Sequence, residues 1–161
     1  MPRKVTGHIV SQVNRPDSAM PVPIDFTGQL FFDREISAGF HCSFIAANQQ
    51  WAKVSGTEGY LELEDFVLPF AGSELRFQVQ KTKFHVNGCD FSMVPDAKSF
   101  TAAEHSHGDP NAQESNLFRN FSRQVLSGAL NASWPEIALK TQRIASACLE
   151  SAGQDGRAIS C

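Results

Sequence analysis

The sequence predicts an α+β protein: a predominantly antiparallel, open-faced β-sheet with helices packed on one face, the helices being the last two elements. Apolar residues recur at every second position through most of the first two-thirds of the 161-residue chain, as in β-strands. After residue 100 they recur with the period of an amphipathic helix. Strands followed by helices are typical of α+β domains, and this length suits one domain.

The strongest strand signal covers residues 36–46. Ile36 and Phe40 fall on one face of an extended chain, and His41 and Ser43 fall on the other. One side of this strand is therefore expected to be buried and the other to be more polar. Further strands are predicted at residues 4–13, 29–33, 60–64, 74–80 and 83–86, with a loop at 14–23 and turns at 33–35, 56–59, 71–73 and 87–88.

Two helices are predicted after the strands. Asp109 before Pro110 is a capping residue followed by one without an amide hydrogen, and Gly128 ends this first helix. Residues 133–136 (Ser-Trp-Pro-Glu) match a capping box, and Gly153 ends the second helix. The apolar stripes are Leu117, Phe118, Phe121, Val125 and Leu126 in the first helix, and Ile137, Thr141, Ile144, Cys148 and Ala152 in the second.

The charge balance disfavours polyanionic partners. Fourteen basic and 17 acidic residues give a formal net charge of −3, so we expect no nucleic-acid or anionic-membrane binding. No apolar run approaches the roughly 20 residues of a membrane span, and no apolar signal segment follows the first basic residues, so a cytoplasmic location is expected. The four cysteines lack zinc-site spacing, which fits a reduced compartment; Cys42 and Cys148 are predicted to be core residues.

One group of candidate binding residues surrounds the start of the first helix. His107, Asn111 and Gln113, with Asp109, form a polar cluster at a loop-to-helix junction, where donors and acceptors could meet a hydroxylated small molecule. The alternative is that Asp109 or Asn111 caps the helix. His105 and His107 have the spacing of two ligands on one side of a strand, but no third ligand lies nearby, so we expect no metal site.

A second group lies between two predicted strands, at residues 47–51 (Ala-Asn-Gln-Gln-Trp). Asn48 and Gln49 could bind sugar hydroxyls, or they could be solvated turn residues beside a buried Trp51. The usual signatures of catalytic and nucleotide-binding sites are missing from the sequence. We therefore expect no catalytic and no cofactor-binding residue in this chain.

The order of several segments resembles that of a known domain. Residues 28–33 (Gly-Gln-Leu-Phe-Phe-Asp), 38–44 and 51–66 (Trp-Ala-Lys-Val-Ser-Gly-Thr-Glu-Gly-Tyr-Leu-Glu-Leu-Glu-Asp-Phe) resemble the C-terminal domain of the glucose-fructose oxidoreductase and inositol dehydrogenase (Gfo/Idh/MocA) family. Residues 113–118 and 134–142 are similar to that family's last two helices. The resemblance runs through nearly the whole chain, so residues 1–161 are expected to form one such domain.

This resemblance implies an NAD(P)-dependent dehydrogenase or reductase acting on a sugar, cyclitol or related hydroxylated substrate. In such enzymes a Rossmann domain binds NAD or NADP, while the second domain covers the substrate and builds the oligomer interface. The present sequence lacks the glycine loop, the E-K-P motif and the D-x-x-x-H pair of that plan. We therefore expect a C-terminal part of such an enzyme that binds no cofactor and is inactive by itself, because hydride transfer needs a fixed nicotinamide and an acid or base.

The expected partners are the protein's own Rossmann domain and further copies of the chain. A homo-oligomer is expected to form through the sheet face that carries Ser37, Gly39, His41, Ser43 and Ile45. Two alternatives stay open. The chain could be a stand-alone binding module for a small apolar ligand, with its 13 phenylalanines lining a cavity, or a purely structural oligomerisation domain.

Overall fold

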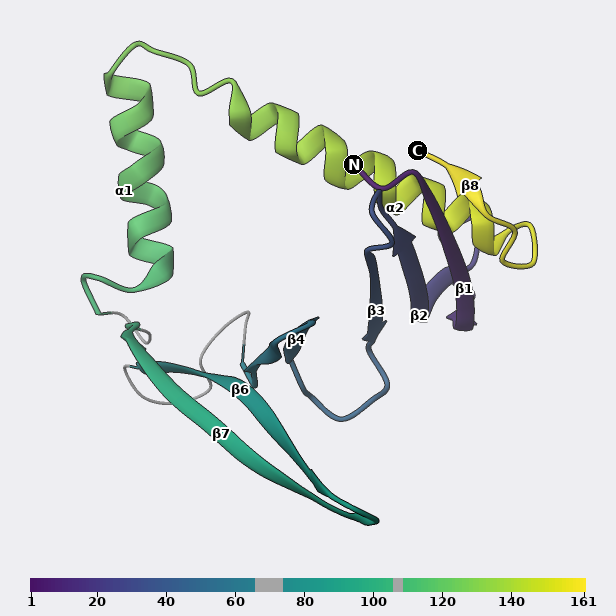
Figure 1. Ribbon diagram of the computed structural model, residues 1–161. Coiled ribbons are helices and arrows are strands. Elements are labelled where there is room, and N and C mark those ends of the chain that lie inside the picture. Colours follow the sequence, from purple (N-terminus) through teal and green to yellow (C-terminus); the bar gives the residue numbers. More distant parts are fainter. Residues whose placement is uncertain (66–73, 106–108) are drawn as a thin grey trace. The chain divides into compact units, whose positions relative to one another are not determined.

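The computed structural model describes residues 1–65, 74–105 and 109–161 (Figure 1). They form two compact units, one of residues 1–47 with 130–161 and one of residues 48–129. Each unit contains a four-stranded antiparallel sheet and one of the two helices, so the predicted α+β class with antiparallel strands and C-terminal helices is confirmed. The predicted turn at 71–73 and the candidate residue His107 lie outside the described residues.

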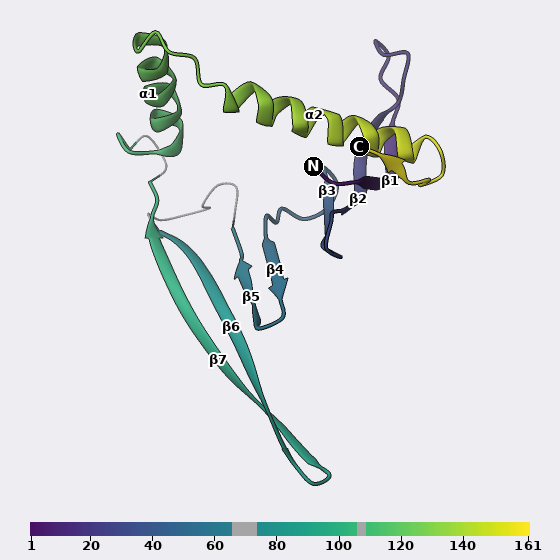
Figure 2. The same ribbon diagram turned by 45° about the horizontal axis from the view of Figure 1, so that its top comes forward.

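The first unit is a sheet with a helix along one face. Its strands are β1 (Lys4–Val13), β2 (Val22–Phe31), β3 (Ser37–Ser43) and β8 (Ile159–Ser160), in the order β3-β2-β1-β8. Helix α2 (Ser133–Ala152) packs on β1, as Figures 1 and 2 both show. The two chain ends meet at this sheet, where the Cys161 amide donates to the Arg3 carbonyl at 3.1 Å.

The core of this unit lies between α2 and strands β1 and β2. Val5, Phe26 and Cys148 are buried there, and Ile144 and Ala152 of the predicted stripe pack against them. Gly7 lets the helix approach closely, because a Cβ at this position would lie 2.2 Å from the carbonyl oxygen of Cys148. The absence of a side chain at residue 7 therefore sets the distance between helix and sheet.

A buried serine joins the last turn of α2 to the sheet. The Oγ atom of Ser151 accepts a hydrogen bond from the Gly7 amide at 3.0 Å and donates one to the Arg157 carbonyl at 2.6 Å. Ser151 is fully buried, so no water can replace these bonds. The hydroxyl thereby fixes both the helix and the turn that leads into β8.

Replacing Ser151 by Ala should lower the free energy of unfolding of the chain by about 1–3 kcal/mol, because the buried Gly7 amide loses its acceptor. Urea denaturation followed by far-ultraviolet circular dichroism measures the change. Ser146→Ala is the matched control, since Ser146 is an exposed serine of the same helix. Equal stabilities of the two variants would contradict the assigned role of Ser151.

The second unit is dominated by a long hairpin. Its sheet has the order β4-β5-β6-β7, formed by Ala52–Gly56, Gly59–Leu63, Glu74–Asn87 and Asp90–Ala103. Of the residues of β6, only 77–80 pair with β5, and Figure 2 shows the β6–β7 hairpin continuing beyond β5. Helix α1 (Gln113–Leu126) belongs to this unit, and none of its residues is buried. The stripe predicted to pack on the sheet is therefore exposed.

Both predicted helix caps are wrong in detail. The Asp109 carboxylate accepts a hydrogen bond from the Asn111 amide at 2.7 Å, and α1 begins only at Gln113. The Ser133 hydroxyl donates to the side chain of Asn131 at 2.6 Å, so the predicted capping box does not form. In both cases a local turn uses the polar side chain that the sequence pattern assigned to the helix end.

Cys148 is a core residue as predicted, but the matching prediction for Cys42 is wrong. Cys42 is exposed, because it lies on β3 at the edge of the sheet and away from α2, which packs on β1. Burial raises the pKa of the Cys148 thiol above its usual value, and the nearby Cys161 raises it further. Cys148 is therefore a neutral packing residue rather than a nucleophile.

Candidate functional site

Asn48 and Gln49 lie in the exposed segment between β3 and β4. The Gln49 side-chain oxygen accepts a hydrogen bond from the Trp51 indole nitrogen at 2.9 Å. Trp51 is exposed, so the structure does not place its ring in the sheet. The Gln49 oxygen is engaged by the Trp51 indole, while the Asn48 side chain faces solvent. A role in binding a hydroxylated substrate stays a prediction for both residues.

Asn111 and Gln113 are both exposed at the start of α1. The Asn111 carbonyl accepts a hydrogen bond from the Asn116 side chain at 2.8 Å, and Arg119 donates to the Pro110 carbonyl at 2.8 Å. These contacts tie the turn before α1 to the helix itself and leave the Asn111 and Gln113 side chains facing solvent.

The two predicted groups are not joined by the contacts of the structure. Among the described residues, no hydrogen bond or ion pair links Asn48 or Gln49 to Asn111 or Gln113. His105, which was paired with His107 only as a possible metal ligand, lies 3.7 Å from the Asp109 carboxylate. His107 lies outside the described residues, so its place beside Asn111 and Gln113 is not given by the structure.

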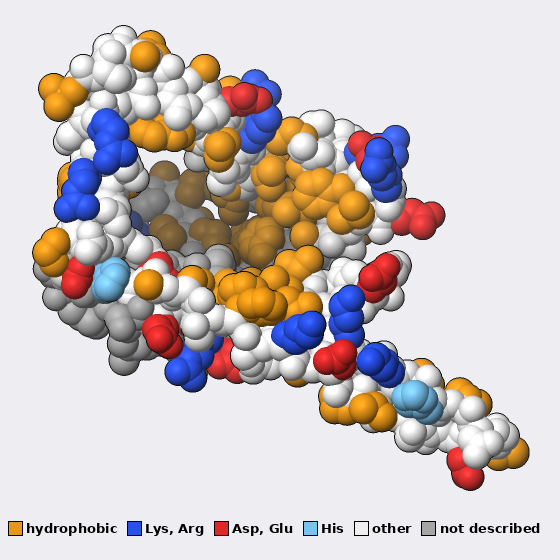
Figure 3. All heavy atoms as spheres, turned by 60° about the vertical axis from the view of Figure 1, so that its left-hand side comes forward, with side chains coloured by type: hydrophobic (Ala, Val, Ile, Leu, Met, Phe, Trp, Pro, Cys, Tyr) orange, Lys and Arg blue, Asp and Glu red, His pale blue; other side chains and the backbone are white. Residues whose placement is uncertain are grey.

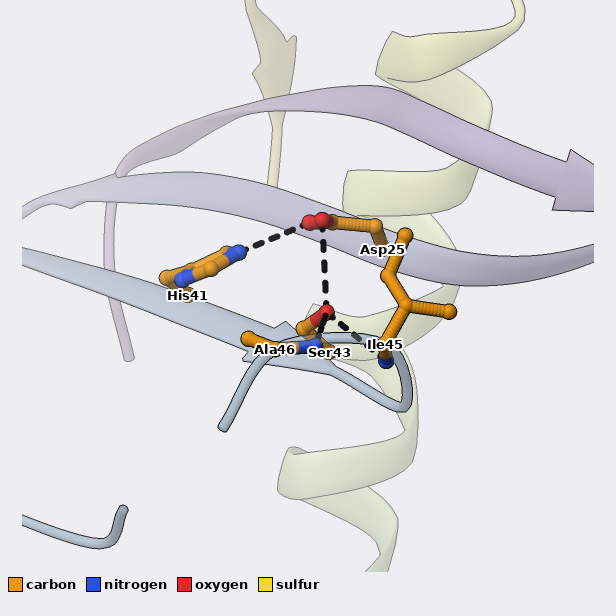
Figure 4. A network of polar contacts seen from close by, with 5 residues as sticks. All are labelled: Asp25, His41, Ser43, Ile45 and Ala46. Atoms are coloured by element: carbon orange, nitrogen blue, oxygen red, sulfur yellow. Dashed lines mark hydrogen bonds and ion pairs between the residues drawn. The ribbon is translucent and has the colours of Figure 1, made fainter. Parts of the chain in front are cut away.

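The structure brings together a different polar cluster on the first sheet (Figure 4). The Nε2 atom of His41 lies 2.7 Å from one carboxylate oxygen of Asp25, and the Ser43 hydroxyl donates to the other at 3.2 Å. The Ser43 oxygen also accepts the amides of Ile45 and Ala46 at 3.2 and 3.1 Å. Asp25 is opposite Ser43 in the register, so strands β2 and β3 share this carboxylate.

The geometry of this cluster defines what it can do. His41 and Ser43 both contact Asp25 rather than each other, so the three side chains do not form the relay in which a histidine takes the proton of a serine nucleophile. The carboxylate instead holds both partners in place across two strands. The His41 side chain is about half exposed, so part of its ring is accessible on this face of the sheet.

Sequence reasoning found part of this cluster and missed its centre. His41 and Ser43 were predicted to share the polar face of their strand, and the register places them there together with Ser37 and Gly39. Ile45 lies beyond the end of β3. Asp25 was missed because the predicted loop ran to residue 23 and the next predicted strand began only at residue 29. The alternation of Asp25, Thr27 and Gln29 with apolar or small neighbours is the signal that could have found it.

A second polar network covers one face of the sheet in the other unit. Lys53 lies 2.9 Å from the Glu62 carboxylate and 4.7 Å from the centre of the Tyr60 ring, and the Tyr60 hydroxyl donates to Gln80 at 2.8 Å. The hydrogen bond to Glu62 raises the pKa of Lys53. Lys53 is therefore a paired ammonium group, and it is not prepared to act as a neutral amine base or nucleophile.

No protein-family model matches the chain. Within the ranges that the structure describes, no group of three or more His, Cys, Asp or Glu side chains is placed to hold a metal ion. Within the same ranges, no helix has both the length and the apolar character that crossing a membrane requires.

Proposed function

We propose that this chain is the substrate-covering and oligomerisation domain of a cytoplasmic NAD(P)-dependent dehydrogenase or reductase that resembles the Gfo/Idh/MocA family. A sugar, cyclitol or related hydroxylated compound is its substrate. Part of the motif that carries the resemblance supports this proposal. Residues 56–59 form the tight turn of the β4–β5 hairpin. A Cβ at Gly59 would lie 2.4 Å from the Gln80 carbonyl oxygen, and the Gly59 φ of 154° also favours glycine at this position.

The observation that carries the proposal is the exposure of large apolar side chains. Among the described residues, Phe26 is buried, whereas seven other phenylalanines are exposed together with Trp51, Val54 and Leu117. Exposed apolar area of this extent is typical of surfaces that another domain or chain covers. The exposed phenylalanines are Phe40, Phe44, Phe84, Phe91, Phe100, Phe118 and Phe121.

In this proposal the hydride transfer belongs to a Rossmann domain, and the chain supplies contacts to the substrate and to other copies. Asn48, Gln49, His107, Asn111 and Gln113 remain the proposed substrate-binding residues. The open face of the first sheet, with Ser37, Gly39, His41 and Ser43, is the proposed oligomer surface. The cluster of His41, Ser43 and Asp25 lies on this face, where it offers paired donors and acceptors to a neighbouring copy.

A dinucleotide titration tests whether dinucleotide binding belongs to a Rossmann domain and not to this chain. The 161-residue chain should leave the fluorescence of NADH and NADPH unchanged, with an intact Rossmann dehydrogenase as the positive control. Tight binding of either dinucleotide by this chain would overturn the proposal, because the nicotinamide would then have a site within it.

The oligomer surface is tested by Gly39→Lys. A side chain fits there without strain, since the nearest atom to a Cβ at residue 39 is the Gly28 carbonyl oxygen at 3.8 Å. We expect size-exclusion chromatography with light scattering to show less self-association than in the unmodified chain, with unchanged circular dichroism. A clean monomer of the unmodified chain at high concentration would count against this surface.

A purely structural oligomerisation domain is the second candidate, because the same exposed apolar faces favour it. The module for a small apolar ligand has less support. It needs most phenylalanines to enclose a cavity, and seven of those described are exposed instead.

A further inference from the structure

The apolar residues of the β6–β7 hairpin change face halfway along it. In the half next to β5, Phe77 and Phe100 are opposite each other and stack at 5.1 Å between ring centres. In the outer half, residues 81–96, Phe84 is opposite Met93 and Val86 is opposite Phe91. Phe84 lies five positions after Val79, and because this offset is odd the two side chains point to opposite faces of the ribbon. The hairpin therefore carries two apolar surfaces on different sides.

The outer half, called the arm below, has no third strand in the described sheet. Strand β5 ends its pairing at Gln80, and residues 81–96 pair only with one another. Four apolar side chains on one side of the arm are 58 to 71% exposed, and Figure 3 shows hydrophobic side chains at the surface of the hairpin. Phe84 and Phe91 stack diagonally across it at 5.8 Å. This apolar side of the arm, made by Phe84, Val86, Phe91 and Met93, is the arm face.

The opposite side of the arm is mostly polar. Lys83 lies 3.7 Å from the Asp96 carboxylate there, and His85 is opposite Ser92. Val94, opposite Lys83, is the one large apolar side chain on this side. The arm is thus an amphipathic two-stranded ribbon, and such a ribbon is marginal in water by itself. A ribbon of this kind becomes stable when its apolar face is covered.

The charges of the arm suit a second copy of the same chain. The charges of its two lysines and two aspartates sum to zero, so two arms can meet without net electrostatic repulsion. The free edge of β7 is a poor site for an added strand, because Pro95 removes a donor and Asp96 and Lys98 carry charge. The face of the arm is therefore better suited to association than its edge.

The size of the arm face sets the strength of the contact. Four side chains with these exposed fractions present on the order of 450 Å² of apolar surface, given roughly 150–250 Å² for a whole aromatic residue. Two such faces bury about 900 Å², close to the roughly 1,000 Å² that a specific interface needs and within the range of weak, transient contacts. The association should therefore depend on concentration.

We propose that the arm face docks on the arm face of a second copy of this chain, about a two-fold axis, and forms a contact distinct from the open face of the first sheet. This contact does not depend on the proposed dehydrogenase function. It needs neither a dinucleotide nor a Rossmann domain.

Sedimentation velocity of the full chain over a concentration series tests the proposal. The pair Phe91→Lys and Ser92→Lys is matched, because these neighbours on one exposed strand point to opposite faces. Phe91→Lys should weaken dimerisation at least tenfold by placing a charge in the apolar contact, and Ser92→Lys should leave it unchanged. Circular dichroism confirms folding, and Phe84→Lys repeats the test at a second position.

The unmodified chain should also show slower hydrogen exchange over residues 81–96 as its concentration rises. A chain that stays monomeric at all concentrations, or a dimer that withstands both Phe91→Lys and Phe84→Lys, would overturn the proposal. A dimer lost in Gly39→Lys but kept in both arm variants would place the contact on the open sheet face alone, and would overturn it as well. The dinucleotide titration is unaffected by any of these results.

Discussion

Phe26→Ala is expected to lower the free energy of unfolding of the chain by about 3–5 kcal/mol, which is the usual cost of removing a buried phenylalanine. Phe26 is 7% exposed and packs with Val5 and Cys148 beneath α2. Its ring also stacks against Phe40, with 6.0 Å between ring centres. The core of this unit is small, so few neighbours can move in to fill the cavity, and the helix loses much of its contact with the sheet.

Urea denaturation monitored by circular dichroism measures this loss, with Phe44→Ala as the control. Phe44 follows β3 and is 89% exposed, so its replacement should change the free energy of unfolding by no more than about 0.5 kcal/mol. Similar transition midpoints for the two variants would show that the unit is not held together by the contact between α2 and the sheet.

Gly7→Ala is expected to lower the free energy of unfolding of the chain by about 3 kcal/mol, because the added methyl group overpacks the contact between α2 and the sheet. The new Cβ would lie 2.2 Å from the Cys148 carbonyl oxygen and 2.8 Å from the Phe26 ring. The first of these is a backbone atom of α2, so the helix has to move away from β1. That movement also lengthens the hydrogen bond from the Gly7 amide to Ser151.

Gly39→Ala is the matched control for Gly7→Ala, because it adds the same methyl group to a glycine of the same sheet. The nearest atom to a Cβ at residue 39 is 3.8 Å away, which is an ordinary contact. We expect this variant to be unchanged or slightly more stable, since alanine restricts the unfolded chain. Destabilisation of both variants to the same extent would argue that strand flexibility, rather than contact with α2, explains the effect.

Elements whose signal is local were predicted well from the sequence. Strand β1 spans Lys4–Val13 as predicted, and the proline-rich loop that follows marks its C-terminal end. Both helices were found from their apolar period and from the glycines after them. The chain turns at Gly88 with a φ of 62°, close to the predicted turn at 87–88.

The long hairpin was predicted least well. Strand β6 was expected as two strands, 74–80 and 83–86, because the apolar residues change face between them and the alternation breaks there. Strand β7 was missed, since Pro95 and the polar residues around it interrupt the pattern. A continuous pairing from Glu74 with Ala103 to Asn87 with Asp90 overrides both interruptions. Backbone hydrogen bonds across the ribbon do not require one apolar face.

The sequence by itself determined the α+β class and the positions of both helices, because each depends on the spacing of residues near in the chain. The side of β3 that was predicted to be buried, with Ala38, Phe40 and Cys42, is exposed. The tertiary structure decided which residues meet. Asp25 reaches His41 and Ser43 through the register of β2 and β3, and Cys42 is exposed because β3 is an edge strand. Strand register and edge position depend on pairing between segments distant in the chain, so the spacing of apolar residues within one segment does not predict them.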